Sequence, residues 1–268
     1  MSESGACAGI GEGRLRHLRF TSETVEPIRI SGLCAQAFAD CYGFLTLACK
    51  LPSPGLFATL VSGELVKALG GMADDLSGRG DGALAKAALA SFAAAQARVH
   101  EGFSHADLRA HYTELFTSPA GPRLMAHEAL FLYYRDNPDA TPGFAPRMFV
   151  NNAALSVERI FKEAGLARNP ESNESADNIA TEAELLSRLF AAKAQMRGEA
   201  EQAASGGDSA GEGEGELALD AVIREFTFYH VTKWHRDFFA AVEAEGIDEF
   251  FTGVGAWGRY LTGIAASL

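Results

Sequence analysis

Apolar residues recur at intervals of three and four along most of this chain, a spacing that places them on one face of an α-helix. The first such stripe consists of Leu33, Ala37, Cys41, Phe44 and Ala48. The second consists of Leu56, Leu60, Leu65 and Leu69, and Gly70 and Gly71 are expected to end its helix. The alternation of apolar and polar residues that indicates β-strands is nearly absent. The pattern therefore predicts an all-α protein.

Prolines divide this helical pattern into two parts. Three prolines and a glycine lie between residues 135 and 147, and we interpret this segment as a hinge. It separates an N-terminal helical part, residues 26–135, from a C-terminal helical part, residues 136–268. Residues 1–25 are expected to form a flexible tail. Two helical parts joined in this way would permit a homodimer formed by domain swapping.

Residues 198–216 contain glycine, serine and acidic residues but almost nothing that could be buried. Such a composition does not support a packed core, so it predicts a mobile acidic loop. A functional alternative is that this loop attracts a basic peptide. Two long helices are expected to follow it, and glycines interrupt the second of them.

Composition and charge narrow the class of protein. With 268 residues, of which 47% are hydrophobic, the chain can bury a substantial core. Its formal net charge of −12 argues against a nucleic-acid partner and favours a basic one. No run of about 18 uncharged apolar residues is present, and no apolar segment follows the arginines near the start. We therefore expect a cytoplasmic protein without stable membrane insertion.

Three cysteines, Cys34, Cys41 and Cys49, lie on one predicted helix at intervals of seven and eight residues. At the rise of an α-helix their Cα atoms are roughly 10 to 12 Å apart, which is too far for a disulfide or for shared metal ligation. They are interpreted as reduced residues of the core.

Catalytic and metal-binding motifs are not recognisable in the sequence. The segment GIGEG follows no predicted strand and lacks the lysine of a phosphate-binding loop, and no nucleophile elbow occurs. Around a regular α-helix His105 and His111 differ by about 240°, and His230 and His235 by about 140°, so neither pair shares a face. His230 lies in line with apolar positions and is interpreted as a hydrogen-bonded core histidine. We expect no enzyme activity, no cofactor and no metal.

The stretch NESADNIATEAELL, residues 173–186, combines an apolar and a polar face. The apolar face consists of Ile179, Ala183, Leu186 and Phe190, and the polar face of Asp177, Thr181, Glu184 and Arg188. One interpretation is structural: Ser175 caps the helix, Asp177 in its first turn suits the helix dipole, and Glu184 pairs with Arg188. The other is that the polar face binds a ligand.

Three segments together resemble the TorD/DmsD family of redox-enzyme maturation chaperones, which is related to NarJ. Residues 108–122, LRAHYTELFTSPAGP, resemble the family's aromatic-x-x-Leu-Phe-x-Gly-Pro element, with Ser118 where glycine is usual. SVERIFKEAGLA followed by ESADNIATEAELL resembles a short helix followed by the family's Glu-x-x-Asp-His element, and HVTKWHRDFFAAV resembles its His-x-x-x-Trp helix. The resemblance covers roughly residues 30–265. Asn178 replaces the histidine of the Asp-His pair, and asparagine cannot become cationic near neutral pH.

The resemblance implies a TorD-like fold of roughly ten helices and a cytoplasmic chaperone. Its implied partner is the twin-arginine signal peptide, the apo form, or both, of a molybdenum-cofactor oxidoreductase before export. An assembly factor of the NarJ type for an enzyme that is not exported is one alternative, and a weak nucleotide-binding hydrolase is another.

A receptor for such a signal peptide needs carboxylates for its arginine pair and an apolar groove for the segment that follows. We expect Asp177 and Glu184 to face the arginines, with Asn178 and Thr181 beside them. The apolar part of the expected signal-peptide site consists of Tyr112, Leu115, Phe116 and Pro119.

Overall fold

The structure is a computed structural model, and it describes residues 26–140, 151–168, 174–205 and 213–268. These residues form helices and no strand, apart from one isolated antiparallel bridge between His127 and Asn178, so the all-α prediction is confirmed. The α-helices are α1 (Gly32–Ala48), α2 (Pro54–Ser62), α3 (Glu64–Asp75), α4 (Gly82–His100), α5 (His105–Tyr112), α6 (Glu128–Asp136), α7 (Asn152–Glu163), α8 (Ile179–Ser205), α9 (Glu214–Phe226), α10 (Arg236–Glu245) and α11 (Glu249–Ala265). Two π-helical segments, η2 (Thr113–Thr117) and η3 (Thr227–His235), continue α5 and α9.

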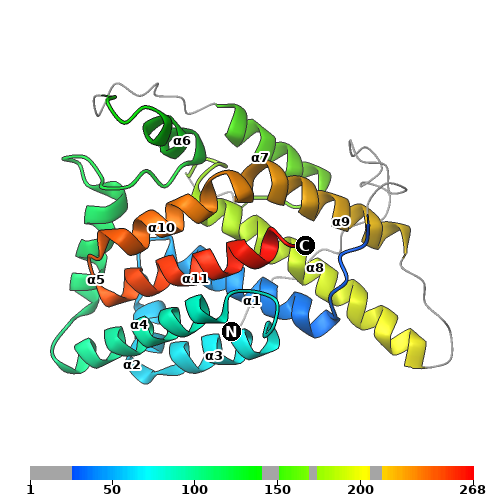
Figure 1. Ribbon diagram of the computed structural model, residues 1–268, viewed down its shortest axis with the longest axis horizontal. Helices are drawn as coiled ribbons and strands as arrows, with labels where there is room; N and C mark the ends of the chain where they lie inside the picture. Colours follow the sequence, from blue (N-terminus) through cyan, green and yellow to red (C-terminus); the bar gives the residue numbers. More distant parts are fainter. Residues whose placement is uncertain (1–25, 141–150, 169–173, 206–212) are drawn as a thin grey trace, which may run out of the picture.

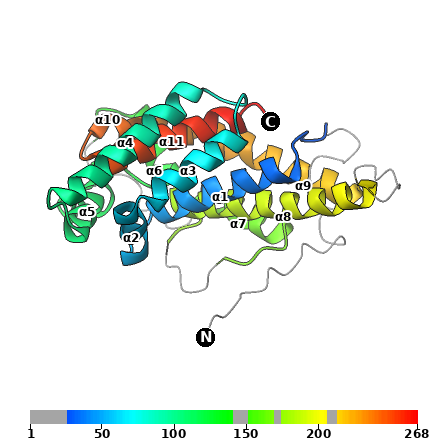
Figure 2. The ribbon, with the colours of Figure 1, turned by 90° about the horizontal axis from the view of Figure 1, so that it is seen from below.

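Helices from the two sides of the predicted hinge pack against one another. Helix α1 runs along α8, and α4 and α10 both pack on α11 (Figures 1 and 2). Buried apolar residues of all these helices belong to one hydrophobic core. The hinge itself reaches into residues 141–147, which lie outside the described residues, as do residues 1–25 of the predicted tail. The two predicted parts therefore share a core.

Three local expectations need correction. The leucine stripe is divided between α2 and α3 because Gly63 adopts the left-handed conformation, with φ of 78°, that ends one helix before the next begins. Helix α3 continues through Gly70 and Gly71 to Asp75. Leu33 lies in the first turn of α1 and is 65% exposed, while its neighbours Cys34 and Ala35 are buried.

Helices occupy both ends of the predicted acidic loop. Helix α8 continues to Ser205, and α9 begins at Glu214, while residues 206–212 lie outside the described residues. Alanine, glutamate and glutamine dominate residues 199–204, and all three have high helix propensity. A helix already formed over the preceding residues extends readily through such a segment, because only its nucleation is costly.

A buried ion-pair cluster fastens the start of the described chain to α8 and α9. Lys193 is fully buried, and its Nζ atom donates hydrogen bonds to Asp220 Oδ1 at 2.6 Å and to Glu216 Oε1 at 3.0 Å. The other oxygen of Asp220 accepts a hydrogen bond from the backbone N–H of Ile28 at 2.8 Å. Lys193 therefore pairs with two carboxylates, one of which holds the extended segment before α1.

None of the described helices is by itself long and apolar enough to cross a membrane. Helices α2 and α3 meet the same requirement of length and composition only when taken together, and they are bent by 80° at their junction.

The cysteines of α1 and its C-cap, Cys34, Cys41 and Cys49, are free and buried, as predicted. Burial raises the pKa of Cys49 to about 12, and it also raises the pKa of Cys41. Because the thiolate is the reactive form, iodoacetamide at pH 8 should leave Cys41 and Cys49 unmodified in the folded protein and modify both in denaturant. Peptide mass spectrometry measures both reactions. Rapid modification of either residue in the folded protein would contradict the described packing.

Candidate functional site

The segment before α8 lies where the starts of α6 and α7 meet. The backbone N–H of Glu128 donates to the carbonyl of Asp177 at 2.8 Å, and that of Ile179 donates to Ala126 at 2.9 Å. Asn151, which caps α7 through a hydrogen bond from Ala154 at 2.8 Å, also reaches this segment. Three helices therefore begin around one short stretch of backbone.

Asp177 holds these helix starts together from inside the protein. Its side chain is fully buried, and Oδ2 accepts hydrogen bonds from Asn151 Nδ2 at 2.9 Å and from the backbone N–H of Ala129 at 3.3 Å. Oδ1 accepts a hydrogen bond from the hydroxyl of Ser175 at 2.5 Å. Both oxygens are thus occupied, and Ala129 lies in the first turn of α6, where an unpaired N–H needs such a partner. We assign Asp177 to the architecture of the site and not to contact with a peptide.

The cap of α8 also differs from the expected one. The helix begins at Ile179, so Asp177 precedes it and does not occupy its first turn. Asn178 is the capping residue: its Oδ1 accepts a hydrogen bond from the N–H of Ala180 at 2.9 Å. Its Nδ2 donates to Glu174 Oε2 at 3.2 Å. The side-chain amide of Asn178 therefore stabilises the fold through both its oxygen and its nitrogen.

Of the expected apolar residues, Leu115 and Phe116 are buried in the core, and so is the polar residue Thr181. Tyr112 is half-buried; its ring lies 5.2 Å from that of Phe116, and its hydroxyl donates to the carbonyl of Cys49 at 3.4 Å. Pro119 is exposed. The structure therefore leaves Tyr112 and Pro119 accessible and encloses the other apolar candidates.

Accessible carboxylates lie near Tyr112. Glu184 is partly exposed and pairs with Lys50 at 3.4 Å and with Arg188 at 3.9 Å. Glu174 has a 55% exposed side chain, and its Oε2 lies 3.7 Å from His127 Nε2. Its negative charge contributes to the raised pKa of Tyr112, after burial and Cys49. We call Glu174 and Glu184 the acidic rim. Glu174 was not selected from the sequence, although it begins the acidic stretch.

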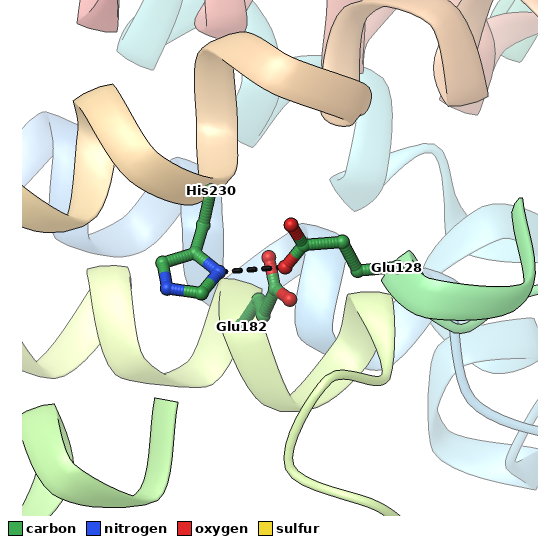
Figure 3. A group of neighbouring side chains, drawn as sticks. All are labelled: Glu128, Glu182 and His230. Atoms are coloured by element: carbon green, nitrogen blue, oxygen red, sulfur yellow. Dashed lines mark hydrogen bonds and ion pairs between the residues drawn. The ribbon is translucent and has the colours of Figure 1, made fainter. Parts of the chain in front are cut away.

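A buried polar network lies beneath this region, on the inner side of η3. His230 Nδ1 lies 2.6 Å from Glu128 Oε2 (Figure 3). Its Nε2 lies 3.0 Å from Ser156 Oγ. His230 is thus confirmed as a hydrogen-bonded core histidine. Glu182 Oε2 accepts hydrogen bonds from Trp234 Nε1 at 3.1 Å and from His235 Nε2 at 2.7 Å.

The π-helical geometry of η3 brings His230 and His235 to the same network, which α-helical spacing did not predict. Hydrogen bonds of a π-helix run between residues five apart, so two residues at that interval approach one face. The expected separation of about 140° applies to a regular α-helix only. The cost of this geometry is offset by the hydrogen bonds that both histidines make inside the protein.

Burial governs the ionisation of this network. It raises the pKa of Glu182 well above its ordinary value, and the nearby carboxylate of Glu128 raises it further. It lowers the pKa of His235 to about 3, so this imidazole is neutral at physiological pH. The His-x-x-x-Trp element contains His230 and Trp234, but nothing in the sequence indicates that they meet Glu128 and Glu182, which lie far away along the chain.

A family model described as nitrate reductase delta subunit matches residues 80–240, more than half of the chain. The matched span includes α6, α7, the start of α8 and η3, which are the elements that meet at the buried network. No curated protein and no solved structure shows significant similarity to the chain.

Proposed function

The chain belongs to the nitrate reductase delta subunit family of NarJ- and TorD-type chaperones, and we propose that its acidic rim receives the arginines of a client's signal peptide. Proteins of this family are assembly factors for molybdoenzymes and not enzymes themselves. The client we propose is the apo form of a molybdenum-cofactor oxidoreductase, held in the cytoplasm before export.

One observation carries this proposal: accessible carboxylates and exposed apolar side chains lie at the same end of α1. Leu47 and Leu51, which flank Lys50, are 55% and 43% exposed, and Lys50 pairs with Glu184. Tyr112 contacts the carbonyl of Cys49 beside them. A twin-arginine peptide has matching chemistry, because adjacent cations are followed by an apolar segment.

Ion pairs and apolar burial are expected to contribute differently to peptide binding. Partly exposed ion pairs contribute about 0.2–1 kcal/mol each, so the acidic rim selects cationic partners without supplying most of the affinity. Burial of the peptide's apolar residues against Leu47, Leu51 and Tyr112 supplies the larger part, at about 25 cal/mol per Å².

Glu174→Gln combined with Glu184→Gln should weaken binding of a peptide with two adjacent arginines and an apolar tail by about three- to tenfold. Each substitution removes a charge and preserves the shape of the side chain. Titration calorimetry of the full chain measures the affinity. The difference in affinity between wild type and the double variant should become smaller as the salt concentration is raised.

Glu158→Gln is the matched control, because Glu158 lies on α7, has a side chain about as exposed as that of Glu174, and pairs with Arg168. Its affinity for the peptide should be unchanged. If the double variant Glu174→Gln with Glu184→Gln, the rim variant, binds the peptide as tightly as wild type, the acidic rim does not bind the arginines. If Asp177→Ala stays folded and loses affinity while the rim variant does not, Asp177 and not the acidic rim contacts the arginines.

The second candidate is a NarJ-type assembly factor that grips the folded apoenzyme of a client that is not exported. The family match supports it equally, because the family's description names a nitrate reductase subunit and no signal peptide. A pull-down with the client's catalytic subunit, with and without its leader, separates the two candidates. Capture that depends on the leader supports the signal-peptide receptor.

A further inference from the structure

Two carboxylates and an imidazole converge inside the protein from three separate elements. Glu128 begins α6, Glu182 lies in the first turn of α8, and His230 lies in η3. One potential ligand atom from each lies within 4.8 Å of those of the other two, and all three residues are buried. The carboxylate of Glu182 points into the space between the ring of His230 and the carboxylate of Glu128 (Figure 3).

A second observation shows that this group is incomplete. Glu182 Oε1 is buried and has no hydrogen-bond partner among the residues that the structure describes. A buried carboxylate oxygen without a partner is costly, and a second carboxylate close by makes it more so. Within the described residues, no lysine or arginine forms an ion pair with Glu128 or Glu182. The negative charge of the group is therefore balanced by a bound proton or by a cation that is not a basic side chain.

We propose that Glu128, Glu182 and His230 bind a divalent transition-metal ion of the Zn²⁺ type. Imidazole nitrogen and carboxylate oxygen are ligands that zinc takes at about 2.0–2.2 Å, whereas Mg²⁺ and Ca²⁺ prefer oxygen alone. His230 Nδ1 is the ligand atom, and the proton on Nε2 is then donated to Ser156 Oγ at 3.0 Å. A hydrogen bond of this kind is what orients metal-bound histidines in proteins.

The bound ion replaces the hydrogen bond between His230 and Glu128, and it displaces any proton held between the two carboxylates. The ion ties α6, α8 and η3 together directly beneath Asp177 and Asn178. Its task is therefore structural: it fixes the frame that carries Glu174. This inference is independent of the identity of the client.

The experiment uses the full chain, purified through a tag without histidines from cells grown with zinc. Elemental analysis after gel filtration should find about one zinc ion per chain. Unfolding with a chelator and refolding with Co²⁺ should give the visible absorption of bound cobalt. Refolding without metal should lower the Tm by about 5 °C or more.

Two variants locate the ion. Glu128→Gln and Glu182→Gln should each lose the metal and the cobalt absorption, whereas Glu174→Gln, beside the partly buried His127, should keep both. If the first two variants fail to fold, the metal content and the cobalt spectrum of the wild-type chain still decide. A wild-type chain that refolds without metal, keeps its Tm and gives no cobalt absorption overturns the proposal, because protons then neutralise the carboxylates. A Glu182→Gln variant that keeps the metal overturns the location.

Discussion

Lys193→Ala should lower the free energy of unfolding by about 3–5 kcal/mol, because it leaves Asp220 and Glu216 buried without their main cation. Arg197, whose Nε lies 3.1 Å from Glu216 Oε1, compensates only for that carboxylate. Asp220 is fully buried and also holds the backbone of Ile28. Urea denaturation followed by circular dichroism measures the loss, as a lower midpoint at constant slope.

Lys86→Ala on α4 is the control for Lys193, since Lys86 is exposed and its removal should change stability by less than about 0.5 kcal/mol. A variant that removes both charges, Lys193→Met with Asp220→Leu, should recover part of the loss, because no unpaired charge then remains at residue 220. Equal stability of wild type and Lys193→Ala would show that the cluster is hydrated.

Gly255→Ala should destabilise the protein by about 3 kcal/mol, at the upper end of the usual cost of overpacking. Helix α11 approaches α10 so closely here that a Cβ atom at residue 255 would lie 2.6 Å from the backbone nitrogen of Glu243 and 2.7 Å from the carbonyl oxygen of Phe239. Backbone atoms cannot move aside as a side chain can, so the two helices must separate. Thermal and urea denaturation measure the effect.

Gly263→Ala provides the matched control on the same helix. No atom lies within 4 Å of a Cβ built there, and alanine is the better helix former by about 0.5–1 kcal/mol, so this variant should be slightly more stable than wild type. If Gly255→Ala and Gly263→Ala have the same stability, α10 and α11 do not pack as described.

Most of the fold follows from local rules that the sequence displays. The spacing of apolar residues predicts the helices, and Ser53 followed by Pro54 gives a typical start for α2. The sequence also shows glycines within its last helix. Which of them meets α10 depends on the packing of two helices, so Gly255 and Gly263 cannot be told apart from the pattern alone.

The site was predictable only in part. Position 177 carries a carboxylate at a helix start, and either an internal cap or a ligand contact is consistent with that pattern. Its burial results from Asn151 and Ala129, which come from other helices and leave no local signal. The convergence of His230 and His235 was missed for a different reason, because periodicity arguments assume α-helical geometry and η3 departs from it.

The attachment of the extended segment before α1 to α9 indicates where a label can be placed on the protein. Arg224 Nε donates to the carbonyl of Glu26 at 3.2 Å, and the N–H of Ile28 donates to Asp220, so residues 26–28 are held beside α9. In Figure 1 this point and α5 lie at opposite ends of the molecule. A fluorophore attached at residue 26 therefore lies far from the Tyr112 end and leaves it open to an incoming client.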